Sequence, residues 1–330
     1  MRDCRFLGRA VLLALAIVSP NAGCWRQPPN TAPVTFNRSA APKISAVLTT
    51  DCGVEIDDQW ALTHLLVSEE VDLRAVITTH ASSIGFSSAT SAQQAAELVA
   101  RLSPSRVSSH PPVVAGSDVP LRDATPSPEN AGVELLLRLS RGFTSSRRLV
   151  VFVIGAATDV ASALLKDPSM ENRVTIIAMG FDDWPSGGDV FNVKNDPLAW
   201  RIILDSDLPV VVGSSAVAKR GLRLTRTEAA GLMRSHGRLG EYLYTLFDRW
   251  VTQQAALVAQ MVAPETWVVW DEVVVAYALG MAQGREVPRP RLQPTLAFVH
   301  PETPRRITWL TQVDTERVWD DFTRKIDLVP

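Results

Sequence analysis

Four carboxylates lie close together near the start of the chain. They are Asp51, Glu55, Asp57 and Asp58, and Gly53 lies in the turn between them. Like charges this close repel one another and raise one another's pKa unless a cation or hydrogen-bond donors neutralise them. Hard cations such as Ca²⁺ prefer carboxylate oxygens as ligands. The segment is therefore typical of a cation site that is built from oxygen ligands.

A purely structural role stays open for three of these carboxylates. Asp57 can cap the helix that is expected to follow it. Glu55 and Asp58 can be solvated charges in the first turn of that helix, where the helix dipole favours negative charge. Asp51 fits neither role because it follows directly on a strand-like segment.

The elements that must position these residues alternate along the chain. Short, almost wholly apolar strands such as 149–154 predict a parallel sheet that is buried on both faces. Continued strand–helix alternation predicts an α/β fold with a doubly wound, mostly parallel sheet. The expected strands are 44–49, 71–78, 112–115, 149–154, 174–179 and 209–212. The expected helices between them are 57–68, 89–102, 131–139, 158–165 and 197–204.

The C-terminal third is expected to be more helical, with only two strand-like pieces. The helices are expected at 229–233, about 241–261, 271–281 and 314–325, and the strands at 295–299 and 306–311. We expect one domain over residues 43–330. In open α/β sheets ligands bind at the carboxyl ends of the strands, which is where Asp51 lies.

The N-terminus has the layout of an export signal. Three arginines precede a short apolar run, and small residues then lead to Cys24. We expect a signal peptide at 1–23 and a Pro- and Ala-rich tether at 24–42. Residues 21–24 (NAGC) resemble a bacterial lipobox, although Asn21 stands where an aliphatic residue is usual. The expectation is an exported lipoprotein on the periplasmic face of a membrane, anchored through Cys24; secretion with an unmodified Cys24 is the alternative.

Charge and cysteine content exclude several classes of protein. The formal net charge of -2 and the pI near 6.2 lack the excess of basic residues that is typical of proteins that bind nucleic acid. After removal of the signal and acylation of Cys24, only Cys52 remains, so no intrachain disulfide is expected. A membrane contact is expected only through the lipid anchor, and a homo-oligomer stays open.

Residues 51–58 resemble the fingerprint of the inosine/uridine-preferring nucleoside hydrolase superfamily, an Asp-x-Asp-Pro-Gly-x-Asp-Asp run after the first strand. This chain has two extra residues in the turn and lacks the proline. It is closer to a divergent branch whose turn is Asp-x-x-x-Glu-x-Asp-Asp. Three later segments resemble family motifs in the same order: 153–161 (VIGAATDVA), 189–197 (DVFNVKNDP) and 270–277 (WDEVVVAY).

The resemblance implies one Ca²⁺ at the bottom of the pocket. Matched motif by motif, its ligands would be Asp51, Asp58, Asp271 and the backbone carbonyl of Ile154. An N-cap role for Asp271 on the helix that follows is the structural alternative. The resemblance therefore implies a nucleoside hydrolase-like domain over residues 43–330.

The same resemblance assigns catalytic and sugar-binding roles. Asp51 would also act as the general base that activates the attacking water. Asp57 and Asn192 would hydrogen-bond the ribose hydroxyls, and Met179 would contact the sugar unless it is a core methionine. The expected substrate is a small-molecule riboside, and attack by water on the anomeric carbon would break its N-glycosidic bond.

Several positions depart from the family pattern on the leaving-group side. Trp270 stands where some members have a histidine, and a tryptophan can stack on an aglycone but cannot protonate it. Ser83 aligns with a ribose-contacting asparagine. Asp189 is a stand-in for an acidic residue whose aligned position is Val190. His80 is a candidate acid, with a hydrogen-bonded structural histidine as the alternative.

These observations predict an enzyme, a Ca²⁺-dependent hydrolase of ribonucleosides or related ribosides. The alternative is a non-catalytic, Ca²⁺-dependent nucleoside- or sugar-binding lipoprotein, which the altered leaving-group side motivates. A phosphatase that uses Asp51 as its nucleophile is disfavoured, because Gly53 stands where the second aspartate of that motif belongs.

Overall fold

The structure, a computed structural model, describes residues 43–102, 110–126, 130–188 and 191–329. The predicted signal peptide, tether and lipidated Cys24 lie outside these residues, and so does Asp189. Within the described ranges, no helix combines the length and the apolar character needed to cross a membrane.

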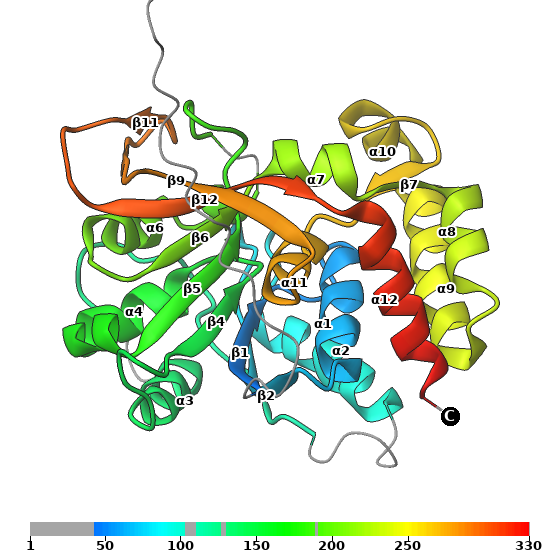
Figure 1. Cartoon of the computed structure of the whole chain (residues 1–330), viewed down its shortest axis with the longest axis horizontal. Coiled ribbons are helices and arrows are strands. Elements are labelled where there is room, and N and C mark those ends of the chain that lie inside the picture. Colours follow the sequence, from blue (N-terminus) through cyan, green and yellow to red (C-terminus); the bar gives the residue numbers. More distant parts are fainter. Residues whose placement is uncertain (1–42, 103–109, 127–129, 189–190, 330) are drawn as a thin grey trace, which may run out of the picture. The chain divides into compact units, whose positions relative to one another are not determined.

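An eight-stranded sheet has the order β3-β2-β1-β4-β5-β6-β12-β9 (Figure 1). Neighbouring strands pair in parallel from β3 to β12, and β9 pairs antiparallel with β12. The strands are β1 (Ile44–Thr50), β2 (Val71–Thr78), β3 (Val113–Ala115), β4 (Leu149–Val153), β5 (Val174–Met179), β6 (Val210–Gly213), β9 (Ala282–Pro288) and β12 (Arg306–Val313). This confirms the predicted doubly wound, mostly parallel α/β fold.

Helices lie on both faces of the sheet (Figure 1). They are α1 (Asp57–Val67), α2 (Ser88–Arg101), α3 (Ala131–Ser140), α4 (Thr158–Lys166), α5 (Asn192–Asn195), α6 (Pro197–Asp205), α7 (Ser215–Gly221), α8 (Arg226–Met233), α9 (Gly237–Gln253), α10 (Ala255–Met261), α11 (Glu272–Ala278) and α12 (Thr315–Asp327). Two 3₁₀ turns, η1 (Ser82–Ile84) and η2 (Pro168–Asn172), and two short ribbons, β7 (Arg223–Thr225) with β8 (Thr266–Val268) and β10 (Arg291–Leu292) with β11 (Phe298–Val299), complete the described part.

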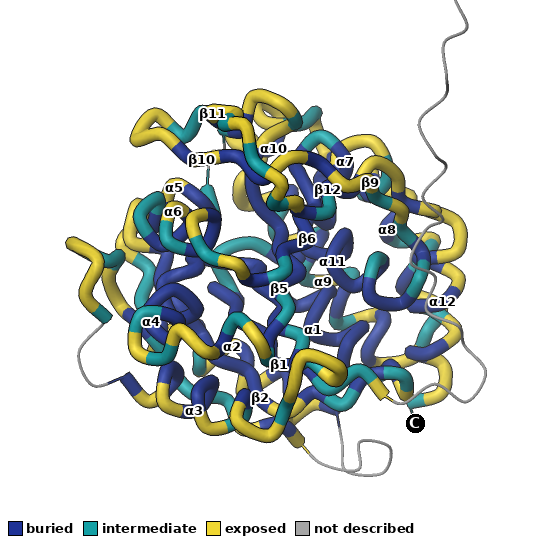
Figure 2. The backbone as a smooth tube through the Cα atoms, turned by 60° about the vertical axis from the view of Figure 1, so that its left-hand side comes forward, coloured by how far each residue is buried: buried dark blue, intermediate teal, exposed yellow. Residues whose placement is uncertain are grey.

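The strands are apolar on both faces because two separate cores cover the sheet. Successive side chains of a strand point to opposite faces. Leu48 and Phe152 belong to the core under α1, α9, α11 and α12, whereas Val47, Val151 and Val153 belong to the core under α3, α4 and α6. Figure 2 shows the central strands as mostly buried and the exposed residues on the outer turns. The burial explains why the central strands β4, β5 and β6 lack alternation of apolar and charged residues.

The C-terminal part differs from the prediction in several places: α7, β7, β8 and β10 were not expected, and the strand expected at 295–299 is only Phe298–Val299. The helix expected at about 241–261 is two helices, α9 and α10. The helix expected at 271–281 ends at Ala278, and the chain then forms the edge strand β9. β9 is largely solvent-exposed and carries Gln283, Arg285 and Glu286, so it has no apolar strand pattern.

The strand order places a ligand crevice between β1 and β4. The chain runs outward from β1 to β2 and β3 on one side, and from β4 to β5 and β6 on the other. Ligands bind at such a topological switch point, outside the carboxyl ends of the strands. Asp51 follows β1 and Ile154 follows β4, and the Ile154 amide donates to the Thr49 carbonyl at 2.9 Å. The fold therefore brings these two residues to one crevice.

Candidate active site

Asp51 lies at the floor of this crevice and is only 2% exposed. Its neighbour across the strands is Gly155, the residue after Ile154. A Cβ atom at position 155 would lie 2.8 Å from both the Asp51 amide nitrogen and Oδ1. Those contacts are far shorter than a real Cβ atom makes, so the close approach of the two chain segments requires glycine.

Asp57 and Asp58 belong to the first turn of α1. Ile56 occupies the N-cap position and makes no side-chain capping bond, so the structural alternative of Asp57 as the cap is wrong. Asp58 is held from the strand side, since the Thr50 hydroxyl donates to its Oδ1. Both carboxylates are buried instead of being solvated as charges on a helix surface.

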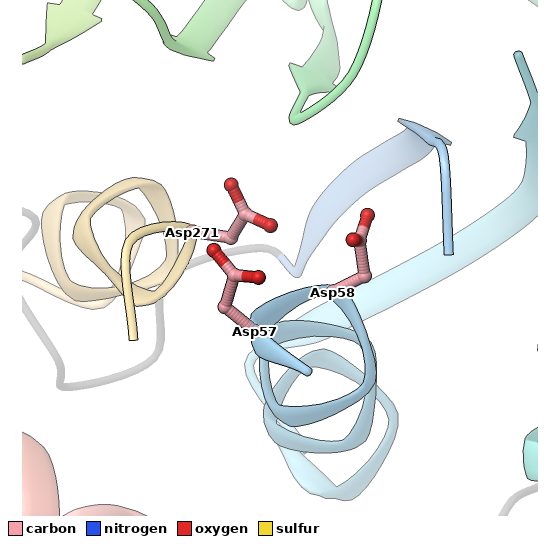
Figure 3. A group of neighbouring side chains, drawn as sticks. All are labelled: Asp57, Asp58 and Asp271. Atoms are coloured by element: carbon pink, nitrogen blue, oxygen red, sulfur yellow. The ribbon is translucent and has the colours of Figure 1, made fainter. Parts of the chain in front are cut away.

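Asp271 comes from a distant part of the chain and joins the same cluster. It occupies the N-cap position of α11, but its side chain makes no capping hydrogen bond. One oxygen from each of Asp57, Asp58 and Asp271 lies within 4.8 Å of the others (Figure 3). The two helix starts thus direct three buried carboxylates to one point, and the cluster includes Asp57, which the sequence assigned to the sugar.

Burial raises the pKa of four aspartates at this site, and repulsion by neighbouring carboxylates adds to the rise for three of them. For Asp51, Asp58 and Asp271 burial is the largest cause of the raised pKa, followed by the charges of neighbouring aspartates. Burial also raises the pKa of Asp57 to about 7, against hydrogen bonds from its own backbone and from Asp271 that lower it. Such a set of acids is stable in its charged form only beside a cation.

The donor set fits a hard divalent cation. Asp51 Oδ2 is buried and has no hydrogen-bond partner among the described residues. An oxygen that is removed from water and left unpaired costs free energy unless a ligand satisfies it. All of the acidic donors are oxygens, which is the ligand type that calcium and magnesium take.

A pocket of about 370 Å³ opens above the cluster. Nine of the residues singled out from the sequence line it: Asp51, Glu55, Asp57, Asp58, Ile154, Met179, Asn192, Trp270 and Asp271. Asn192 is fixed there because its amide Nδ2 donates to the Met179 carbonyl at 3.2 Å. The lining also contains Ser215, Lys219 and Met261, which the sequence analysis did not assign.

Ser83 and His80 are not brought to this pocket. His80 is fully buried, with Nδ1 accepting from the Ser82 amide at 3.2 Å and Nε2 bonded to the Thr158 hydroxyl at 3.0 Å. Burial lowers its pKa, which favours the neutral ring. Ser83 is exposed on η1, and its amide donates to Asn195. His80 is therefore a buried, hydrogen-bonded structural histidine and not an acid of the pocket, and Ser83 lies on the outer surface.

Trp270 forms one wall of the pocket and is 8% exposed. Its ring packs edge-on against Trp267, with ring centroids 6.3 Å apart. The Lys219 ammonium lies 5.4 Å from the Trp270 ring centroid. This wall is aromatic and cationic, whereas the floor is acidic.

A family model described as "Inosine-uridine preferring nucleoside hydrolase" matches residues 46–320. The chain belongs to that family. The matched range contains the four sequence motifs and all of the residues that line the pocket. This nucleoside hydrolase is therefore an enzyme of the hydrolase class that acts on nucleosides.

Solved nucleoside hydrolases share the fold. A plant nucleoside hydrolase superposes with a TM-score of 0.70 at 20% identity, over 87% of this chain and 99% of the other. A purine-preferring ribonucleoside hydrolase from Gardnerella vaginalis gives 0.70 at 19% identity, over 86% and 98%. An inosine-guanosine nucleoside hydrolase gives 0.69 at 18% identity, over 87% and 99%. Among curated protein sequences, none matches this chain.

Proposed function

We propose that this nucleoside hydrolase is a Ca²⁺-dependent enzyme that cleaves the N-glycosidic bond of ribonucleosides or related ribosides. The buried carboxylate cluster at the switch point of the sheet carries the proposal. Structural proteins rarely bury several mutually repelling acids, because each is costly to desolvate when unpaired. A cation and a polyhydroxylated sugar together account for the cluster and for the pocket above it.

The residues that would hold the ion are Asp51, Asp58, Asp271 and the carbonyl of Ile154. Of these, Asp58 and Asp271 form, together with Asp57, the group whose oxygens lie within 4.8 Å of one another, and Asp51 lines the same pocket. Calcium takes six to eight oxygen ligands. The protein oxygens leave coordination positions for ribose hydroxyls or water. When bound, the ion supplies positive charge that holds the carboxylates ionised and orients the sugar.

The chain's own residues supply the rest of the chemistry. Asp51 accepts a proton from the water that attacks the anomeric carbon, while the bond from that carbon to the leaving nitrogen breaks. Asp57 and Asn192 bind the sugar hydroxyls and hold the anomeric carbon near that water. The transition state is oxocarbenium-like, so the anionic floor stabilises it. Attack in a single step inverts the configuration at this carbon.

Trp270 provides a flat apolar surface for the aglycone. Stacking of a nucleobase on a tryptophan ring supplies binding energy and is tolerant of base identity. The base preference is therefore set by other groups of the wall.

Sugar-release assays test this function. Purified protein in millimolar Ca²⁺ is expected to release ribose from a nucleoside panel or from p-nitrophenyl riboside. Asp51→Ala should abolish release, whereas Asp205→Asn, which alters an exposed carboxylate, should keep wild-type rates. Tight nucleoside binding without release from any substrate would instead support the binding-only alternative.

We also propose that the chain is exported and anchored through Cys24, on the strength of the N-terminal sequence pattern. Mass spectrometry of protein from a bacterial host should find an acylated cysteine at the mature N-terminus. Cys24→Ser should move the protein from the membrane fraction to the soluble fraction. An intact N-terminus in both forms would contradict the proposal.

A further inference from the structure

The aromatic wall of the pocket contains the ammonium group of Lys219, which has no role in the chemistry proposed above. Of the described residues that line the pocket, six are acids and Lys219 is the single base. The acids are Asp51, Glu55, Asp57, Asp58, Asp182 and Asp271. No ion pair of Lys219 is found among the described residues, and its ammonium faces the Trp270 ring at 5.4 Å.

Helix α7 aims Lys219 at the pocket. Ser215 and Lys219 are four residues apart, so they share one face of the helix, and both line the pocket. The start of the helix is fixed to the loop after β5, because the Ser215 amide donates to the Phe181 carbonyl at 3.0 Å. Arg220 lies outside the lining, and its guanidinium bonds the Thr311 carbonyl at 3.5 Å.

Cleavage of an N-glycosidic bond requires an acid near the leaving nitrogen, and the Lys219 ammonium can act as one. When the bond breaks, its electron pair stays on the leaving nitrogen, which becomes negative unless it is protonated. The Trp270 indole N–H can donate a hydrogen bond, but it is too weak an acid to give its proton to the leaving nitrogen. An ammonium beside the stacking surface has three N–H donors and a positive charge.

We propose that Lys219 donates a hydrogen bond and then a proton to the leaving atom of an aglycone stacked on Trp270. The inference rests on the proposed function. The water oxygen bonds to the anomeric carbon, its proton goes to Asp51, and the leaving nitrogen takes the Lys219 proton. Asp51 then releases its proton to solvent and the neutral Lys219 amine takes one up, so both groups return to their starting forms with no net change in protons. The favoured substrate class is then unactivated ribosides, such as natural nucleosides, whose aglycones are poor anions.

Two substrates with different leaving groups test the role. The p-nitrophenolate ion is stable without protonation, whereas a nucleobase leaving from inosine or uridine needs it. For Lys219→Met, which keeps the length of the side chain, kcat/KM on the better nucleoside should fall by about 10²-fold or more. On p-nitrophenyl riboside the same variant should stay within about threefold of wild type, since acid catalysis is not required there.

Two further variants separate this role from a structural one. Arg220→Met should retain wild-type rates on both substrates. Lys219→Arg keeps the charge and the hydrogen-bond donors, but a guanidinium does not give up a proton, so it should recover less than about tenfold of the lost nucleoside activity. Full recovery in Lys219→Arg would overturn the proton transfer. Calcium affinity, measured by calorimetry, should be unchanged in Lys219→Met.

Equal losses on both substrates, or no loss on either, would overturn the role of Lys219 while the proposed function stands. A weakened calcium affinity in Lys219→Met would show that the lysine serves the metal site instead, and would also overturn it. A wild-type protein that releases sugar from neither substrate would refute the proposed function itself.

Discussion

Substitution of Gly155 by alanine is expected to disable the site with little harm to the rest of the fold. The new Cβ atom would lie 2.8 Å from the Asp51 amide nitrogen, 2.8 Å from its Oδ1 and 2.9 Å from Thr79 Cγ2. Ordinary contacts of a Cβ atom begin at 3.4 Å, so the shortfall is about 0.6 Å. Two of the three atoms belong to Asp51, which must therefore move.

The size of the effect follows from this displacement. Overpacking of a buried position costs about 1–3 kcal/mol of folding free energy. Catalytic groups must be held within about 0.5 Å, and a misplacement of about 1 Å costs about 10²-fold in rate. Because the shortfall is about 0.6 Å, we expect Gly155→Ala to lose about 10- to 10²-fold in kcat and to weaken calcium binding, with a stability loss of about 1–3 kcal/mol.

Steady-state sugar release and urea denaturation measure the two effects. The matched control is Gly231→Ala on the exposed side of α8, where a Cβ atom meets nothing within 4 Å. That change should leave kcat unaltered and raise stability by about 0.5–1 kcal/mol, because alanine favours the helix. A Gly155→Ala protein with wild-type kcat and stability would refute the packing argument.

Three further outcomes are expected. Because burial raises the pKa of Asp57 to about 7, metal-free protein gains stability as pH falls from 8 to 6, and calcium affinity by calorimetry should be higher at pH 8. Asp271→Asn should raise the melting temperature of the metal-free protein and weaken calcium binding in the same assay, since it removes one repelling charge. His64, fully buried between Glu272 and Asp321, ties α1 to α11 and α12, so His64→Leu should cost about 3–5 kcal/mol in urea denaturation. Burial lowers the pKa of His64, but these carboxylates outweigh it and raise the pKa, so the ring's contribution is complete below about pH 6.5 and is lost as pH rises through the higher folded value. A stability of the metal-free protein that does not change between pH 8 and 6 would contradict the first result, and a wild-type stability of Asp271→Asn or of His64→Leu would contradict the second or the third.

Much of the sheet was predictable because its strands are buried on both faces. The bounds of β2 and β5 match the sequence prediction residue for residue. β5 is almost wholly apolar and is followed by Gly180, whereas β2 alternates apolar residues with Asp72 and Arg74 before its apolar end. β9 was missed for the opposite reason. It is an exposed edge strand, and only its pairing with β12 defines it.

The acidic floor of the pocket could be predicted from the sequence, and the wall that contains Ser215 and Lys219 could not. Asp51, Asp57 and Asp58 form a dense local motif, and Asp271 carries a motif of its own. Ser215 and Lys219 carry no such signal, because they reach the pocket only through the way α7 packs against the loop after β5. His80, the histidine of the predicted site loop, is buried and hydrogen-bonds the Thr158 hydroxyl. Its position in the sequence gave no indication of that partner.

A crystal structure of the protein grown in millimolar calcium tests the central claim most directly. The account predicts one ion, bound by Asp51, Asp58, Asp271 and the Ile154 carbonyl at about 2.3–2.6 Å, with waters or sugar hydroxyls on the pocket side. A site that stays empty at that concentration, or an ion that contacts Asp58 and leaves Asp271 unbound, would contradict it.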